Sequence, residues 1–467
     1  MRIINGGGAL YEKQPKVYPR EIDGRFQRLR TMVVFWLLGM FYAFPWISIG
    51  GQQLVLFDLP ARRFHLFGLT FWPQDFFLLT MLLVIAALSL FFFTSLAGRL
   101  WCGYACPQTV WTEVFLWMER YVEGDRNARM RLDKAPWSRS KLARKATKQL
   151  IWISFALWTG FTFVGFFTPI RELGREVVIA QLGGWELFWI VFYAFATYGN
   201  AGLLREQVCK YMCPYARFQS AMFDRDTLVI SYDEQRGEPR GHRSRSAALR
   251  AVDTAGTSVA APVLGDCIDC LACVQVCPTG IDIREGLQIE CIACAACIDA
   301  CDAVMDKMAF SRGLIRYTTE SELAGQPLRI VRPRTLVYAG VLLAFIAAFC
   351  WGVVARKPLI VEVLHDRNAL FRKVGRDSIE NSYNVKLANK SDQAIELTLR
   401  PETSLPLTAI GAPAATLEPG EVFSLPLTLR ASAGNVHGRA PILVAVVTKN
   451  GTVIARGKTH FFAPEVP

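Results

Sequence analysis

The chain has 467 residues, of which 52% are hydrophobic, and its formal net charge is +12. This length and hydrophobic content exclude a small soluble domain and are typical of a membrane protein with more than one domain. An excess of Lys and Arg in such a protein usually marks cytoplasmic loops, and no basic motif interleaved with aromatic residues is present. We therefore expect no nucleic acid among the partners.

Five segments are long and apolar enough to be predicted as membrane spans. Residues 1–30 are polar and basic without an apolar signal-peptide core, so we expect an uncleaved N-terminal tail. A helix needs about 20 apolar residues to cross a bilayer. The sequence meets this requirement, with few or no charges, over residues 31–50, 76–98, 149–170, 184–204 and 335–355.

The basic residues predict the orientation of these spans. Residues 1–30 and 99–148 are rich in Lys and Arg, whereas the loop 51–75 has only Arg62 and Arg63 and the loop 171–183 only Arg171 and Arg175. Because cytoplasmic loops carry the excess of Lys and Arg, we expect the N-terminus in the cytoplasm. Five spans then place the segment before the last span in the cytoplasm and the C-terminal region in the periplasm.

A cysteine motif of the form C-x-Y-x-C-P follows the second span and returns after the fourth. The motifs contain Cys102 with Cys106, and Cys209 with Cys213. The repetition predicts a duplicated two-span unit whose ends meet. Such thiols can chelate a soft metal, for which copper(I) is the preferred ion, or switch between dithiol and disulfide. A further iron–sulfur cluster and simple burial as small apolar residues are the alternatives.

A polar, basic segment follows, over residues 233–262. It has few aromatic residues, and we predict a mobile linker or surface loop. A DNA-binding tail is the alternative interpretation of its charge.

Eight cysteines then form two runs with identical spacing, C-x2-C-x2-C-x3-C, which is the bacterial two-cluster ferredoxin pattern. In that pattern the fourth cysteine of each run binds the other cluster. The predicted ligands of one 4Fe-4S cluster are therefore Cys267, Cys270, Cys273 and Cys301, and those of the other are Cys291, Cys294, Cys297 and Cys277. Zinc needs only four ligands and leaves the third cysteine of each run unexplained. Disulfides are disfavoured in the cytoplasm.

Alternating apolar residues dominate the region after the fifth span. Examples are Tyr383 to Leu387, Phe423 to Leu429 and Ile442 to Val446, and Asn450-Gly451 is a hairpin-turn signal. This periodicity predicts an all-β, immunoglobulin-like sandwich. The predicted fold is thus a five-helix membrane bundle with a ferredoxin domain and a β-sandwich. The boundaries are a tail at 1–30, a four-helix membrane domain at 31–224, a linker and ferredoxin domain at 225–334, a fifth helix at 335–355 and the sandwich at 356–467.

Together these features strongly resemble the FixG/CcoG family of cytochrome c oxidase accessory proteins, which are membrane-bound polyferredoxins. The resemblance covers nearly the whole chain and is carried by WCGYACPQTVWTEVF (101–115), CKYMCPYARFQSAMFD (209–224), the ferredoxin runs (265–302) and VLHDRNALFRKVGRDSIENSYNVKLANK (363–390). It implies a protein of the bacterial inner membrane that reduces Cu(II) to Cu(I) for the haem-copper centre of cbb-type cytochrome oxidase. Copper is then the substrate, held by the four C-x-Y-x-C-P thiols. Oxidase subunits, copper chaperones or a copper transporter are the expected partners.

Two other functions fit the same residues. One is a membrane electron wire that carries electrons from quinol to a respiratory partner without holding copper. The other is a redox sensor or assembly scaffold without turnover. No flavin or nicotinamide fingerprint is present, so the electron donor must be external, and the sequence does not identify it.

Overall fold

The computed structural model describes residues 16–242, 264–366, 369–375, 377–391, 393–403, 405–411, 414–432, 434 and 436–464. The chain divides into two compact units. The first unit comprises Met1–Ile47 with Leu83–Phe345, and the second comprises Ser48–Leu82 with Ile346–Pro467. Helices α2 (Phe76–Ala97) and α15 (Pro333–Val354) therefore belong partly to each unit.

Four helical segments among the described residues are long and apolar enough to cross a membrane: Arg25–Trp46, Pro73–Ala97, Gly184–Leu204 and Pro333–Val354. The first begins with α1 (Arg25–Ala43), and the third combines α8 (Gly184–Thr197) with the π-helix η3 (Tyr198–Leu204). The span predicted over residues 149–170 is not among them. Its helix, α6 (Arg139–Val164), begins ten residues earlier with several Lys and Arg residues, and these lower its mean hydropathy.

Short helices surround the two C-x-Y-x-C-P motifs. The first motif lies on α3 (Leu100–Tyr104) and leads into α4 (Pro107–Glu123) and α5 (Arg126–Lys134). Helix α7 (Ile170–Val178) connects α6 to α8. The second motif lies on the π-helix η4 (Val208–Met212) and leads into α9 (Pro214–Ser220). Pro107 and Pro214 each occupy the first helical position, where a missing N–H costs nothing.

The ferredoxin region is built on α12 (Ala272–Val276), the short 3-10 helix η5 (Ile283–Glu285) and α13 (Ala296–Met308). Strands β6 (Val229–Tyr232) and β7 (Ile315–Thr318) pair antiparallel beside them, next to the short helices α10 (Glu234–Gly237) and α14 (Glu320–Leu323). The predicted linker 233–262 is thus ordered at its start, in α10, while residues 243–263 lie outside the described residues.

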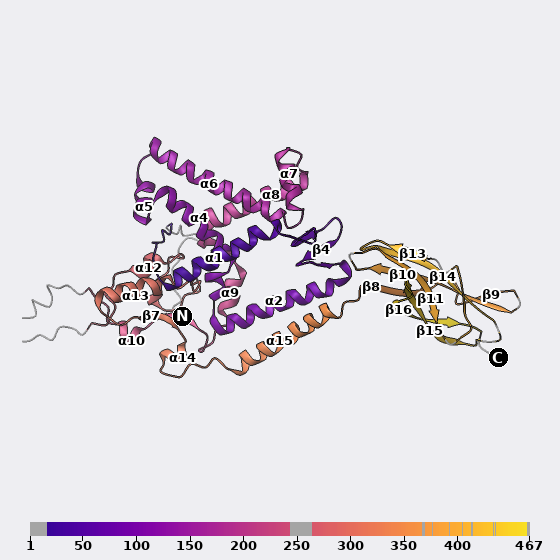
Figure 1. The fold of residues 1–467 in the computed structure, drawn as a ribbon. Coiled ribbons are helices and arrows are strands. Elements are labelled where there is room, and N and C mark those ends of the chain that lie inside the picture. Colours follow the sequence, from indigo (N-terminus) through magenta and orange to yellow (C-terminus); the bar gives the residue numbers. More distant parts are fainter. Residues whose placement is uncertain are drawn as a thin grey trace, which may run out of the picture. The chain divides into compact units, whose positions relative to one another are not determined.

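The C-terminal region has the predicted all-β architecture of two sheets around one core (Figure 1). One sheet has the order β12-β14-β10-β8, with β9 also paired to β10, and the other β13-β11-β15-β16. Their bounds are β8 (Leu359–His365), β9 (Arg372–Val374), β10 (Ser378–Asn389), β11 (Ile395–Glu402), β12 (Thr408–Ile410), β13 (Ala414–Leu417), β14 (Val422–Ser432), β15 (Arg439–Thr448) and β16 (Val453–Phe462). The Asn450-Gly451 turn joins β15 to β16 as predicted.

Residues 48–82 join the sandwich in the second unit, which the sequence did not indicate. They form two small antiparallel sheets, β1 (Ser48–Ile49) with β2 (Gln52–Gln53), and β3 (Val55–Asp58) with β4 (Arg63–Leu66) and β5 (Leu69–Phe71). The 3-10 helices η1 (Phe44–Trp46) and η2 (Pro73–Asp75) flank them. The indole of Trp72 donates to the carbonyl of Lys390 at 3.0 Å, and buried Asp75 pairs with Lys390 and Arg356.

Candidate functional site

The structure brings together the first predicted set of cluster cysteines. We call Cys267, Cys270, Cys273 and Cys301 the first cysteine group, and all four line one cavity at the junction of α12 and α13. The pKa of the Cys301 thiol is raised to about 12, mainly by burial and then by Cys273, Asp302, Cys267 and Cys270.

The second predicted set is also gathered at one place. We call Cys277, Cys291, Cys294 and Cys297 the second cysteine group. Burial raises the pKa of the Cys297 thiol well above its ordinary value, and Cys294, Cys291 and Cys277 raise it further. The hydroxyl of Thr279 lies 3.3 Å from the Cys277 sulfur. The fourth cysteine of each run therefore lies with the first three of the other run.

The two runs share one backbone conformation, which explains how each gathers three thiols. Positive φ angles occur at Asp269 and Leu271 in the first run, and at the equivalent Ala293 and Ala295 in the second. Residues other than glycine rarely adopt such angles, and they persist where the surrounding structure requires them, often at functional sites. The repeated conformation turns successive thiols toward a common point.

The donor sets fit 4Fe-4S clusters. Each group consists of four cysteines, the first set against the apolar side chains of Leu314, Ile315 and Met305, and thiolates are the ligands such clusters use. Within the described ranges, no three Cys, His, Asp or Glu side chains form a group suited to a single metal ion. A cubane is larger than one ion and is held by thiolates at its corners, so a group that does not suit a single ion can still hold a cluster.

The four C-x-Y-x-C-P thiols, here called the paired motif thiols, also come together. Cys102 is buried, and Cys106, Cys209 and Cys213 are half-buried. The pKa of the Cys102 thiol is raised to about 12, chiefly by burial, while Arg99 lowers it and the other three thiols raise it. Burial is also the main reason that the pKa of the Cys209 thiol is raised to about 11, with Cys106 and Cys213 raising it further and Arg99 lowering it. The ends of the two motifs thus meet as predicted.

Two glutamines cross-brace the motifs. Gln108, just after the first motif, donates to the carbonyls of Asn200 (2.8 Å) and Arg205 (3.1 Å), which precede the second motif. Gln219, after the second motif, is completely buried and accepts from Arg99 Nε at 3.1 Å, while its amide donates to the carbonyl of Gly98. The same Gln219 oxygen lies 3.5 Å from the Cys102 sulfur. Each motif is therefore held in position by a glutamine that follows the other motif in the chain.

The first motif contacts the second cysteine group directly. A Cβ atom at Gly103 would lie 2.8 Å from the carbonyl oxygens of Ile292 and Ala293, so only glycine allows this approach. Cys102 and Cys294 share one buried apolar cluster with Ile292. The guanidinium of Arg99 donates to the carbonyl of Cys291 at 3.2 Å. The second cysteine group is thus packed against the paired motif thiols.

The ferredoxin region also caps the first membrane helix. Helix α1 has Gly24 at its N-cap, with no side chain of its own to accept from the first N–H groups. The carboxylate of Asp299, on α13, accepts instead from the backbone N–H groups of Phe26 (3.3 Å) and Gln27 (2.8 Å). A carboxylate at a helix N-terminus satisfies free donors and the helix dipole.

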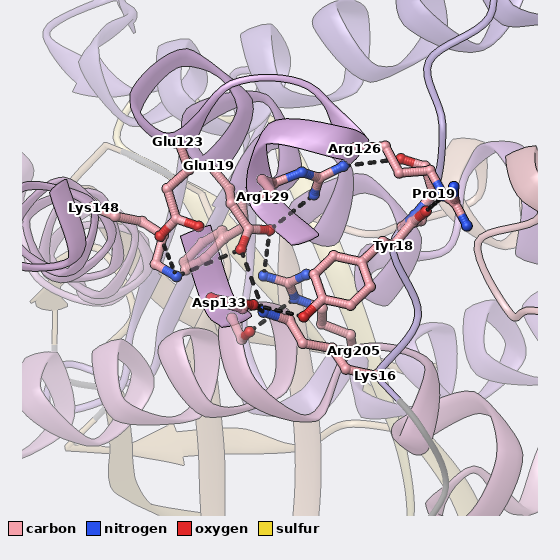
Figure 2. A network of polar contacts seen from close by, with 12 residues as sticks. Lys16, Tyr18, Pro19, Glu119, Glu123, Arg126, Arg129, Asp133, Lys148 and Arg205 are labelled. Carbon is pink, nitrogen blue, oxygen red and sulfur yellow. Dashed lines mark hydrogen bonds and ion pairs between the residues drawn. The ribbon is translucent and has the colours of Figure 1, made fainter. Parts of the chain in front are cut away.

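A buried ionic network supports the second motif (Figure 2). Glu119 on α4 is 1% exposed. Its carboxylate forms ion pairs with Arg129, Arg205 and Lys148, with N···O distances of 3.2, 2.8 and 3.4 Å. Burial raises the pKa of Glu119, but Arg205, Lys148, Lys16 and Arg129 outweigh it, and the pKa is lowered overall. Arg205 ends η3 with a φ of 44°. Its ion pair fixes the chain four residues before Cys209.

The network extends to the N-terminal tail and the neighbouring helices. Tyr18 donates to Asp133 at 2.6 Å, and Arg129 donates to the carbonyl of Pro19 at 2.9 Å. Lys148 also pairs with Glu123 at 2.9 Å. The described part of the tail is therefore bound to α4 and α5 (Figure 2).

The sequence analysis assigned no role to Arg99, Gly103, Gln108, Glu119 or Gln219. Two of them carried a usable signal, since Gly103 and Gln108 lie inside or next to a motif whose second copy differs there. Glu119 also carried a signal, because it is one of several charged residues that interrupt the apolar sequence of α4. Their partners could not be deduced, because the contacts join segments far apart in the chain.

Three family models match separate parts of the chain. A family model described as a 4Fe-4S binding domain matches residues 76–122, one described as a 4Fe-4S dicluster domain matches 204–320, and one described as an IG-like fold at the C-terminal of FixG, putative oxidoreductase, matches 349–464. The chain is 42% identical over 447 residues to nitrogen fixation protein FixG of Rhizobium meliloti, covering 88% of this chain and 82% of that protein.

Two further relatives are similar. Protein RdxB of Cereibacter sphaeroides is 40% identical over 429 residues, covering 88% of this chain and 87% of that protein. The crystal structure of a FixG-related protein from Vibrio parahaemolyticus is 28% identical and covers 23% of this chain and 98% of its own, with a TM-score of 0.21.

Proposed function

This chain belongs to the FixG family of iron–sulfur proteins, and on that premise we propose that it reduces Cu(II) to Cu(I) for the haem-copper centre of cbb-type cytochrome c oxidase. The observation that carries the proposal is the contact between the paired motif thiols and the second cysteine group at Gly103. Soft thiolate ligands select copper(I) over copper(II). A copper ion held there would lie beside a source of electrons.

In this proposal the cysteine groups hold the clusters and the paired motif thiols hold the substrate. When bound, two 4Fe-4S clusters supply one-electron storage and transfer. Cys267, Cys270, Cys273 and Cys301 would ligate one cluster, and Cys277, Cys291, Cys294 and Cys297 the other. Cys102, Cys106, Cys209 and Cys213 would bind copper, and because no three described side chains are grouped for a single ion, these thiols would have to draw closer together when the ion binds. Each Cu(II) takes up one electron and leaves as Cu(I), so one reducing equivalent is consumed per ion.

We further propose five spans in the bacterial inner membrane, with the ferredoxin domain cytoplasmic and the sandwich periplasmic. Helices α2 and α8–η3 both end at the paired motif thiols, so the chain between them must return across the membrane. Helix α6 is the longest candidate between them, and its 26 residues extend about 39 Å at about 1.5 Å per residue. Its charged first turns would lie at the cytoplasmic boundary, where Lys and Arg are favoured.

The test uses full-length protein in detergent, without oxygen and with its clusters reduced chemically. One equivalent of Cu(II) is added, and cluster reoxidation and Cu(I) formation are followed together. We expect both in the wild type and neither in the variant with Ser at positions 102, 106, 209 and 213. Cys350→Ser, which alters the exposed cysteine of α15, is the matched control.

Unaltered copper reduction in the quadruple variant, with its clusters intact, would overturn the assignment of the thiols. Clusters that stay reduced in the wild type would leave the electron wire or the scaffold as the function. Oxidase subunits, copper chaperones or a copper transporter are the partners this function requires.

A further inference from the structure

A cavity of about 310 Å³ lies beside the second cysteine group, with Cys291 in its lining. Its walls come from Arg99 just after α2, from Phe223 and strand β6, and from the segment before Cys294. The lining residues are Arg99, Phe223, Val229, Ile230, Leu287, Gln288, Ile289, Cys291 and Ala293. Cavities from about 300 Å³ upward, mostly apolar with a few fixed polar groups, are typical of small-molecule sites.

The polar groups of the cavity are held in place by other contacts. The Arg99 side chain is 5% exposed, and it is anchored by hydrogen bonds to Gln219 and to the carbonyl of Cys291. Gln288 donates through its amide to the carbonyl of Asp282 at 2.6 Å. An arginine and an amide held in the lining of a mostly apolar cavity suit a flat ring that carries oxygen atoms.

The location favours a ligand that arrives from the lipid. Arg99 follows α2, which is one of the four helices apolar enough to cross a membrane. Leu287 and Ile289 line the cavity and are 51% and 56% exposed, so part of its apolar lining reaches the surface of the protein. If the donor were a water-soluble carrier protein, we would expect a polar, charged rim around the site, because protein–protein interfaces have polar rims.

We propose that this cavity binds an isoprenoid quinol, and that the quinol is the electron donor to the clusters. This inference rests on the proposed function. A quinol loses two electrons and two protons, and becomes a quinone. With both clusters bound, they would supply the two one-electron acceptors that this needs, and the two protons would pass to water. Electrons would enter beside Cys291, which lines the cavity, and would leave across Gly103, which lies against Ile292 and Ala293, so the second cysteine group contacts both places.

This arrangement gives a reason for two clusters. The donor releases electrons in pairs, whereas each copper ion accepts one. The cluster of the first cysteine group would store the second electron until another Cu(II) binds. One quinol would therefore reduce two copper ions in succession.

Binding is measured with heptyl-hydroxyquinoline N-oxide, a fluorescent quinol analogue, on the full-length protein in detergent without copper. We expect saturable quenching at one site per chain that a short-chain quinone displaces. Ile289→Trp fills the cavity and should weaken binding at least about tenfold. Ile330→Trp is the matched control, because Ile330 is 57% exposed and does not line the cavity. It should bind within about twofold of the wild type.

Leu287→Trp is a second filling variant and should behave like Ile289→Trp. Quenching that is absent, that is unaffected by both filling variants, or that phosphatidylglycerol vesicles displace while quinone does not would overturn the proposal. Reduction of the clusters by a soluble ferredoxin but not by quinol would do the same. Because binding is measured without copper, a failure here leaves the copper test unaffected, and a failure of copper reduction leaves the quinol site standing.

Discussion

In the β-sandwich, strands β10, β14 and β15 direct alternate apolar side chains into one shared core, where Val385, Leu427 and Val446 are completely buried. In the first unit the buried apolar residues fall into several smaller clusters. The segments between those clusters are joined by buried polar side chains, among them Glu119 and Gln219. A region that surrounds redox centres has less room for a continuous apolar core, and its precise positions come from hydrogen bonds and ion pairs.

The largest effect should come from removing the central charge of the first unit. Glu119→Gln keeps the shape of the side chain but leaves Arg129 and Arg205 without a carboxylate partner and Lys148 with Glu123 alone. Breaking a buried ion pair in this way costs about 3 to 5 kcal/mol. We expect faster hydrogen exchange in α4, α5 and η3, with the sandwich unchanged.

The matched control is Glu320→Gln. The Glu320 side chain is 71% exposed and lies 3.8 Å from Arg225, and such pairs contribute about 0 to 1 kcal/mol. Equal effects of the two substitutions would mean that the buried network does not hold the first unit together.

The corresponding substitution in the sandwich removes a buried apolar side chain instead of a buried charge. Leu427→Ala removes a completely buried side chain from the shared core and should destabilise the sandwich by about 3 kcal/mol. Hydrogen exchange should rise in β10 and β14 while the visible absorption of the clusters stays unchanged. Val422→Ala, at a position 57% exposed, should have little effect. Loss of the clusters in Leu427→Ala would show that the two regions are not independent.

A smaller effect is expected at the cap of α1. Asp299→Ala leaves the N–H groups of Phe26 and Gln27 without their acceptor, at a cost of about 1 kcal/mol. Asp299→Asn should retain most of the stability, since asparagine caps helices as well as aspartate does. Thermal unfolding of the three proteins measures the difference. The capping role is wrong if Asn and Ala destabilise equally.

The smallest expected effect is that of pH on the free energy of unfolding, for pH values between about 5 and about 7. The folded-state pKa of Glu119 is lowered from its ordinary value of 4.5. Its stabilisation is therefore complete above the unfolded pKa and is lost as the pH falls through the folded pKa. Between about pH 7 and about pH 5, the network should contribute a constant free energy of unfolding. Below that range the wild type should lose stability that Glu119→Gln already lacks, and parallel pH profiles of the two proteins would contradict this.

Sequence reasoning succeeded where the signal is local. The alternation of apolar residues from Tyr383 to Leu387 marks β10, and the turn at Asn450-Gly451 marks the β15–β16 hairpin, because both depend only on neighbouring residues. The cysteine spacing likewise predicted which thiols gather, since each run forms its own turn. The FixG family was recognised from the same local motifs.

Sequence reasoning failed where the contact partners are distant in the chain. Asp299 caps a helix that begins more than 270 residues earlier, and nothing near either residue indicates the pairing. Residues 48–82 were assigned only as a loop and the start of a span, yet they join the sandwich through Trp72 and Lys390.

The most direct test of the account is the rate of electron transfer across Gly103. Gly103→Ala places a methyl group against the carbonyls of Ile292 and Ala293 and forces α3 away, whereas Gly199→Ala adds one where nothing lies within 4 Å. Stopped-flow reoxidation of the reduced clusters by one equivalent of Cu(II) should slow at least about tenfold in Gly103→Ala, since a displacement of about 1 Å can cost that much or more. Copper binding and cluster content should stay normal, and Gly199→Ala should match the wild type. An unchanged rate in Gly103→Ala would contradict an electron path from the second cysteine group to the paired motif thiols.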